Sequence, residues 1–307
     1  MTGEGAKATE SAVPFILAHL SDAHIGPLPR PRNRELLGKR LTGYINWRRG
    51  RDRIHNMEVL AQLVADLRAQ QPDHIAMTGD VLNIGLAAEF PFASAWLQTL
   101  GDPLNVSFVP GNHDAYVRSS LMHLQRTFAP WTGADAGGEP SYPYLRVRDE
   151  IALIGLQSGI PTAPLLASGR LGTAQRDRLE ILLAETGARG LMRVVMIHHP
   201  PNRGGASPGR GLTDARKLEA ILAKHGAELV IHGHNHRHSV IYLQGPKTRI
   251  PVIGVASASA IPGSERHRAA YHLYEIEKRD SGWHVAGRIR GMRQGTDDIV
   301  DLGEFSI

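Results

Sequence analysis

The chain has 307 residues, of which 42% are hydrophobic and 21% charged, with a net charge of +5. This composition is typical of a folded globular protein that can bury a sizeable core. It contains no cysteine, which excludes disulfides, thiolate metal sites and a cysteine nucleophile. No run approaches the ~18 consecutive apolar residues of a membrane-spanning helix. Residues 1–13 lack the apolar core of a signal peptide, so we expect a disordered tail followed by one domain over residues 14–307.

Apolar runs predict strands along most of the chain. Their ranges are Phe15–Leu20, His74–Thr78, Val106–Val109, Ile151–Leu156, Arg193–Ile197 and Glu228–Ile231. Helical spacing of apolar residues predicts helices between them, at Ile54–Leu67, Thr173–Glu185 and Thr213–His225. Strands that alternate with helices predict an α/β fold with largely parallel pairing. A final group of strands, Ile250–Ala256, Tyr271–Glu277 and Trp283–Arg288, predicts a second sheet packed on the first.

Three segments lie outside these elements. Residues 131–143 are rich in Gly and Pro and are predicted to be a structural loop. Residues 199–211 form a longer loop of similar composition, which predicts a lid with Arg203 and Arg210 as substrate-binding residues. Residues 30–53, called here the basic segment, contain nine basic and two acidic residues, a net +7, so the rest of the chain carries −2. Charge gathered in one segment does not predict a uniformly basic nucleic-acid surface.

Five short motifs, most of them directly after predicted strands, carry residues that can bind metal. In open α/β sheets, ligands gather beyond the carboxyl ends of strands. The motifs contribute carboxylates, one amide and several imidazoles, the donors that bind divalent transition metals. Two such ions ~3.5–4 Å apart can activate a water molecule and hold a phosphoryl group during displacement. The five motifs are Asp22-Ala23-His24, Gly79-Asp80, Gly111-Asn112-His113-Asp114, His198-His199-Pro200 and Gly233-His234-Asn235-His236.

This ordered set resembles the motifs of the calcineurin-like metallophosphoesterase family and spans about two thirds of the chain. The resemblance implies a four-layer α/β/β/α metallophosphoesterase sandwich with two divalent metal ions at one sheet edge. It implies one metal held by Asp22, His24, Asp80 and His236, and a second held by Asp80, Asn112, His198 and His234, so that Asp80 bridges the two ions. Mn is the favoured metal, with Fe, Zn or Co as alternatives.

Two further residues receive catalytic roles from the same resemblance. His113 would stabilise the developing phosphoryl charge or protonate the leaving oxygen. Asp114 would accept the other ring N–H of His113 and fix its tautomer. His198 is preferred to His199 as the ligand by the same alignment. His19 and His232 are expected to pack or to form hydrogen bonds beside the site, and His238, His267 and His272 are assigned to surface or scaffold.

The basic segment predicts either a cap over the site or a membrane contact. On a helical wheel its apolar residues share one half, and basic residues with Trp, Tyr and Leu suit a membrane interface. The stretch Lys39–Trp47 is also similar to lipid-acting bacterial members of the family, of the phospholipase C and UDP-diacylglucosamine pyrophosphatase types. The apolar residues are Leu36, Leu37, Leu41, Tyr44, Ile45 and Trp47.

The sequence thus predicts a metal-dependent phosphoric ester hydrolase that acts on a phosphodiester or pyrophosphate, preferably at a phospholipid or lipid-linked substrate. No Ser nucleophile elbow or phosphate-binding P-loop is present, so direct attack by metal-activated water is favoured over a covalent intermediate. A soluble cyclic-nucleotide or nucleotide phosphodiesterase, a nuclease and a non-catalytic metal-containing lipid-binding module remain alternatives. We expect a cytoplasmic protein with no nucleic-acid partner, and peripheral contact with the inner face of the membrane if the basic segment binds lipid.

Overall fold

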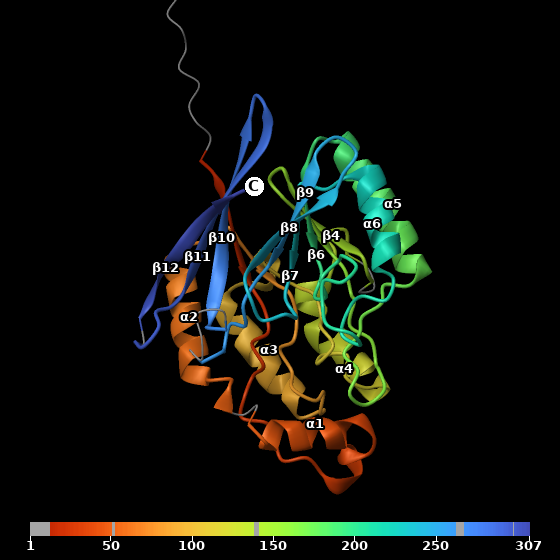
Figure 1. The fold of residues 1–307 in the computed structure, drawn as a ribbon, viewed down its shortest axis with the longest axis vertical. Coiled ribbons are helices and arrows are strands. Elements are labelled where there is room, and N and C mark those ends of the chain that lie inside the picture. The colour runs from red at the N-terminus through yellow and green to blue at the C-terminus, as the bar shows by residue number, and fades with distance from the viewer. Residues whose placement is uncertain (1–12, 51–52, 138–140, 262–266, 297) are drawn as a thin grey trace, which may run out of the picture.

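The fold is built on two six-stranded sheets, seen edge-on in the computed structural model of Figure 1. The structure describes residues 13–50, 53–137, 141–261, 267–296 and 298–307, so nearly all of the tail predicted for residues 1–13 lies outside it. The first sheet has the order β12-β11-β10-β1-β2-β3. β1 (Phe15–Leu20), β2 (His74–Met77) and β3 (Val106–Phe108) are parallel. β10 (Ala270–Arg279), β11 (Gly282–Met292) and β12 (Ile299–Ser306) extend the sheet antiparallel from β1.

The second sheet has the order β4-β5-β6-β7-β9-β8. Its centre is parallel: β5 (Ile151–Gly155), β6 (Met192–Met196), β7 (Leu229–His232) and β9 (Arg249–Gly254). Antiparallel edge strands β4 (Tyr144–Arg148) and β8 (Ser239–Gln244) close its two sides. Because β5, β6 and β7 are mostly apolar and buried along their whole length, they pack against other layers on both faces.

Helices cover the outer face of each sheet. α2 (Met57–Ala69), α3 (Glu89–Leu100) and α4 (Arg118–Thr132) pack on the first sheet, and α5 (Thr173–Ala188) and α6 (Ala215–His225) pack on the second. A third apolar cluster lies between the sheets and includes Leu17, Val194 and Ile253. These layers confirm the predicted α/β/β/α sandwich.

Several predicted boundaries differ from the structure. α2 begins at Met57, because the Asn56 side chain accepts hydrogen bonds from the amides of Glu58 and Val59 and caps the helix there. The helix predicted from Thr213 starts at Ala215 instead, and the Thr213 hydroxyl donates to the Gly169 carbonyl rather than capping it. The predicted loop over residues 131–143 is also wrong at its start, because residues 131 and 132 form the end of α4.

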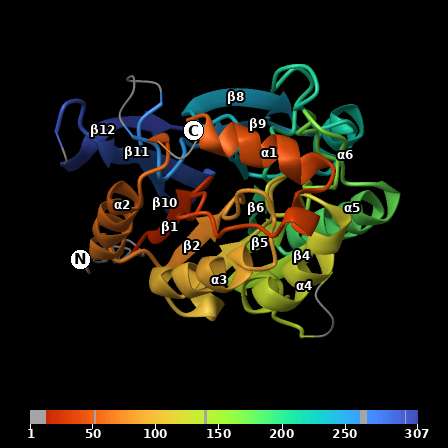
Figure 2. The ribbon, with the colours of Figure 1, turned by 90° about the horizontal axis from the view of Figure 1, so that it is seen from below.

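The basic segment folds into the short 3₁₀ turn η1 (Asn33–Leu36) and helix α1 (Lys39–Arg48). Viewed from below, α1 lies across one end of the sandwich, over the ends of both sheets (Figure 2). A second 3₁₀ turn, η3 (Pro103–Asn105), precedes β3. In the described part of the chain, no helix is long and apolar enough to cross a membrane.

Candidate metal centre

The predicted ligands lie on turns that follow parallel strands of both sheets. Asp22 and His24 follow β1, Asp80 follows β2, and the turn after β7 supplies His234 and His236. All five have positive φ angles, between 42° and 69°, in the left-handed region that residues other than Gly rarely adopt. Such backbone strain costs about 1–3 kcal/mol per residue and gathers at functional sites. The fold therefore holds these side chains in a costly arrangement.

The turns bring six of the predicted ligands into two groups. Asp22, His24 and His236 form one, and Asp80, His198 and His234 form the other. Within each group the potential ligand atoms all lie within 4.8 Å of one another. The imidazole Nε2 of His236 lies 3.1 Å from Asp22 Oδ1, and Nε2 of His198 lies 3.2 Å from Asp80 Oδ2.

The two groups adjoin each other. The backbone amide of His234 donates to Asp22 Oδ2 at 3.0 Å, so a turn of the second sheet is tied to a ligand of the first. Asp80 Oδ1 accepts the backbone N–H of His113 at 2.7 Å. Both aspartates are buried. The junction of the two sheets thus forms a compact pair of sites.

Backbone carbonyls fix the orientation of two ligand imidazoles. Nδ1 of His24 lies 3.0 Å from the Leu82 carbonyl, and Nδ1 of His198 lies 2.7 Å from the Thr78 carbonyl. A metal-binding histidine usually donates its other ring N–H to such an acceptor, which sets the tautomer. The arrangement therefore suits metal binding through Nε2.

The geometry also separates His198 from its neighbour His199. Both ring nitrogens of His199 are in hydrogen bonds, with Ser158 Oγ at 2.8 Å and with the Ala167 carbonyl at 3.0 Å. Nε2 of His198, in contrast, faces Asp80 and lies 3.2 Å from Nδ1 of His234. These contacts favour His198 as the ligand.

The site attracts positive charge. Burial opposes protonation of His198, but the Asp80 carboxylate outweighs it and raises the pKa of that imidazole to about 9. Burial would raise the pKa of Asp80, yet His198 and His113 lower it well below its usual value. In His234 and His199, burial dominates and lowers the pKa. Two buried carboxylates among imidazoles form a donor set suited to divalent cations.

Two buried oxygens support this fit. Asn112 Oδ1 accepts no hydrogen bond from any residue that the structure describes, and Asp22 Oδ1 has the imidazole of His236, itself a predicted ligand, 3.1 Å away; both oxygens are inaccessible to solvent. An unpaired buried acceptor costs about 1–3 kcal/mol. A cation would satisfy both oxygens, so the residues present fit a dinuclear metal centre.

His113 lies at this centre, but its predicted partner is wrong. The Asp114 carboxylate accepts four backbone N–H groups, from Asp80, Val81, Leu82 and Gly111, at 2.7–3.0 Å. It therefore shapes the loop around the site and does not orient the His113 ring. Nδ1 of His113 instead lies against the Asn83 carbonyl. Its ring packs edge-on to His24, with ring centroids 4.9 Å apart.

The histidines predicted to lie beside the site do so. Nε2 of His19 lies 2.9 Å from Thr78 Oγ1, and Nδ1 of His232 lies 2.9 Å from the Gly233 carbonyl. His272 is buried and lies 3.2 Å from the His238 ring, whereas His267 is exposed. All of these positions agree with scaffold or surface roles.

The predicted substrate-binding arginines are placed differently. The Arg203 guanidinium pairs with Glu219 of α6 at 3.0 Å, and its side chain is 69% exposed. Arg203 thus pairs with α6 at the surface, and the structure does not support its predicted role in substrate binding. Arg210 is exposed farther along the same loop. The loop itself reaches the centre, because Asn235 Nδ2 donates to the Gly205 carbonyl at 2.8 Å.

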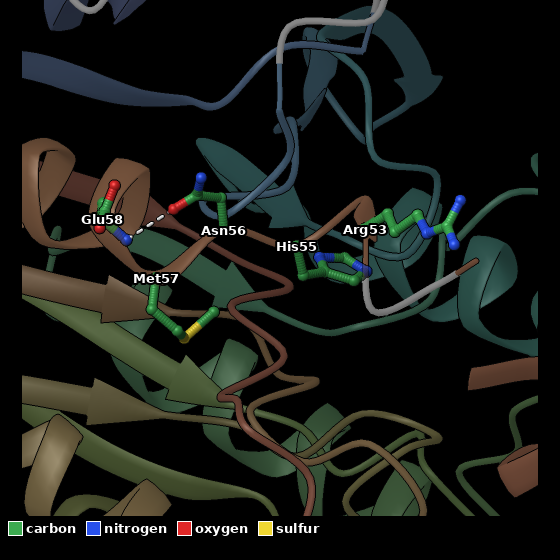
Figure 3. Close-up of a pocket in the computed structure, with 5 residues that line it drawn as sticks. All are labelled: Arg53, His55, Asn56, Met57 and Glu58. Atoms are coloured by element: carbon green, nitrogen blue, oxygen red, sulfur yellow. Dashed lines mark hydrogen bonds between the residues drawn. The ribbon is translucent and has the colours of Figure 1, made fainter. Parts of the chain in front are cut away.

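His55 is a buried neighbour of the centre that sequence reasoning missed. Its ring lies 4.4 Å from that of His24 and 6.0 Å from that of His236, and is parallel to Trp47 of α1. Nδ1 lies 2.8 Å from Ser259 Oγ. His55 lines a surface hollow together with Arg53, Asn56, Met57 and Glu58 (Figure 3). A lone His before a helix gives no sequence signal for this position.

Two curated relatives are phosphodiesterases by description. The chain is 29% identical over 188 residues to a "Probable cyclic nucleotide phosphodiesterase" of Synechococcus, covering 60% of this chain and 65% of the relative. It is also 29% identical over 188 residues to a glycerophosphodiester phosphodiesterase of Enterobacter lignolyticus, covering 61% and 57%. The matched region therefore spans less than two thirds of each relative.

Solved structures share the fold. A dimetal phosphatase from Danio rerio superposes with a TM-score of 0.60 at 16% identity, covering 94% of this chain and 100% of that one. Purple acid phosphatase from yellow lupin gives 0.56 at 12% identity, covering 96% and 55%. At the level of families, residues 15–238 match the calcineurin-like phosphoesterases, a dimetal-dependent family. The chain therefore belongs to the calcineurin-like phosphoesterase family.

Proposed function

We propose that this protein hydrolyses a phosphodiester or pyrophosphate bond by direct attack of water at a dinuclear metal centre. The observation that carries the proposal is the pair of buried ligand groups at the junction of the two sheets. In this assignment the first metal is held by Asp22, His24, Asp80 and His236, and the second by Asp80, Asn112, His198 and His234. Two bound divalent ions, Mn favoured, would supply a Lewis acid and an activated water.

We assign His113 a role in the chemical step on the substrate and not in metal binding. With Nδ1 against the Asn83 carbonyl, proton transfer to the leaving oxygen falls to Nε2. The backbone N–H of His113 donates to Asp80 Oδ1, which ties the position of this ring to the proposed bridging ligand. The Asp114 carboxylate accepts the backbone amides of Asp80 and Gly111, and so holds the two loops that carry Asp80 and His113. His113 therefore acts on the leaving group, and Asp114 is a positioning residue.

A phosphodiester substrate is supported by the two relatives, whose descriptions name diesters. We further propose that the diester or pyrophosphate belongs to a phospholipid or lipid-linked molecule, because of the surface of α1. Leu41 and Ile45 of α1 are 46% and 40% exposed, and Leu37, just before the helix, is 77% exposed. Arg48 and Arg49, at the end of the same helix, are also exposed. An exposed apolar stripe beside basic residues suits an anionic membrane interface.

A soluble nucleotide diester is the second candidate, supported by the Synechococcus relative. The experiment is a turnover screen of the protein loaded with Mn²⁺. Its substrates are a cyclic nucleotide, a glycerophosphodiester, a lipid-linked pyrophosphate, and anionic phospholipid presented in vesicles and in detergent. Turnover of the phospholipid above the soluble diesters supports the lipid assignment, and turnover of the cyclic nucleotide alone contradicts it. Failure on every diester and pyrophosphate would contradict the proposed reaction itself.

A further inference from the structure

Lys39, the first residue of α1, is a buried cation near the metal centre. The residue is only 7% exposed, although lysine is rarely buried without a partner. Burial lowers the pKa of its ammonium to about 8, while the Asp80 carboxylate acts in the opposite direction. The group therefore remains mostly charged at neutral pH and lies within the electrostatic reach of a proposed metal ligand.

Tyr116 connects Lys39 to His113. The Lys39 ammonium lies 4.4 Å from the centroid of the Tyr116 ring, in a cation–π contact. The same ring stacks on that of His113, with centroids 5.5 Å apart. Lys39 and His113, the residue assigned to the leaving group, thus both contact the Tyr116 ring.

The ammonium group retains unused hydrogen-bonding capacity. It has three N–H donors, of which one is given to Thr162 Oγ1 at 2.5 Å and another faces the Tyr116 ring. No carboxylate of a described residue lies within 4.0 Å of Nζ. A buried charge is normally paired, so an anion is the ligand that this position lacks.

The surrounding structure holds Lys39 in this place. Arg40 donates to the carbonyls of Ile84, at 3.2 Å, and Gly85, at 2.5 Å, which fastens α1 to the loop after Asp80. A Cβ on Gly43 would lie 2.2 Å from the Tyr116 hydroxyl, so α1 packs directly on that ring. Lys39 therefore belongs to a packed wall of the site, and the apolar stripe of α1 lies on a different side.

We propose that Lys39 binds a second anionic group of the substrate, next to the phosphoryl group that is hydrolysed. This inference rests on the proposed function and narrows its substrate class. It favours a pyrophosphate, or a diester whose leaving group carries a phosphate or carboxylate, over a diester with a single negative charge. Lys39 is then a specificity residue, and α1 contributes to recognition inside the site.

The test measures binding of two phosphonates of matched length to the Mn²⁺-loaded protein by calorimetry. 3-Phosphonopropionate has a second anionic group, and butylphosphonate replaces that group with an uncharged chain. Wild type should bind 3-phosphonopropionate more tightly. Lys39→Met should weaken that binding at least about tenfold, the range for a charged hydrogen bond, with a much smaller effect on butylphosphonate. Lys39→Arg should restore part of the difference.

Lys217→Met, on the exposed face of α6, is the matched control and should behave as wild type. Equal affinity of wild type for the two phosphonates would overturn the proposal. An equal loss for both in Lys39→Met would also overturn it, because that pattern indicates a structural role. Hydrolysis of bis(p-nitrophenyl) phosphate by wild type is measured in parallel. Absence of turnover on this diester and on every substrate of the screen above would contradict the proposed function, whereas the phosphonate comparison tests Lys39 directly.

Discussion

Replacement of Gly111 by Ala tests whether the ligands are held at a fixed spacing. A Cβ at this position would lie 2.2 Å from Asp80 Oδ1 and 2.7 Å from the His198 ring. Neither side chain can yield easily, because Asp80 Oδ1 accepts the His113 amide and His198 Nδ1 lies against the Thr78 carbonyl. Both side chains are also buried. The added methyl group therefore pushes two proposed ligands away from the metal positions.

The size of the effect follows from overpacking, which typically costs about 1–3 kcal/mol in a buried site. If metal binding restores the original ligand positions, this strain opposes binding and lowers metal affinity about 5- to 150-fold. Calorimetric titration of the metal-depleted protein with Mn²⁺ measures the change. Gly211→Ala is the control, since a Cβ there meets no atom within 4 Å. Wild-type Mn²⁺ affinity in Gly111→Ala would refute the reasoning.

Three further predictions concern residues around the same centre. His113→Ala should retain its metals and lose a factor of about 10²–10⁴ in turnover of a diester with a poor leaving group, as measured by steady-state kinetics. Turnover in His113→Ala equal to that of wild type would show that His113 takes no part in the chemical step. His199→Ala should keep both metal ions in elemental analysis, whereas His198→Ala should lose one. The reverse pattern would exchange their assignments. Charge reversal at Arg48 and Arg49 should weaken binding to anionic vesicles in co-sedimentation by roughly 30-fold or more, because each basic residue contributes about 1 kcal/mol. Hydrolysis of a small soluble diester should be unchanged, and wild-type protein that ignores such vesicles at low salt would contradict the membrane contact.

The ligand positions could be predicted because motif and strand together determine them. Each motif sits where a parallel strand ends, and such ends meet at one edge of a sheet. The left-handed turns at Asp22, Asp80 and His234 are local, so the short motifs carry most of the information. The four layers could be predicted for a similar reason, since alternating strands and helices leave few other arrangements.

Other features depend on contacts between distant residues. The His113 ring is oriented by Asn83 rather than by Asp114, across 30 residues of sequence. Lys39 reaches Thr162 across 123 residues, and nothing in its local sequence separates it from the other basic residues of its segment. α3 was not predicted because its pattern is weak. Glu89 at its start is buried and accepts backbone amides of the preceding loop, including that of Leu86.

In helix α1 of the basic segment, too, the sequence pattern did not predict which side chains are buried. Its apolar residues were grouped on one half of a helical wheel, yet Trp47 is buried while Leu41 and Ile45 are exposed. The difference arises because α1 packs on the loop after β2 and on Tyr116, and the wheel does not reveal which side meets the protein. Arg51, also part of this segment, lies outside the described residues.

The central claim is that Asp80 joins two metal sites, and metal content per chain tests it most directly. The account predicts two divalent ions in wild type and the loss of at least one in Asp80→Ala, measured by elemental analysis after dialysis against Mn²⁺ at fixed free concentration. Asp135→Ala, which removes an ion pair with Arg148 and a hydrogen bond from the Val147 amide, should retain both ions. An Asp80→Ala protein that keeps two ions, or a wild-type protein that binds fewer than two, would contradict the account.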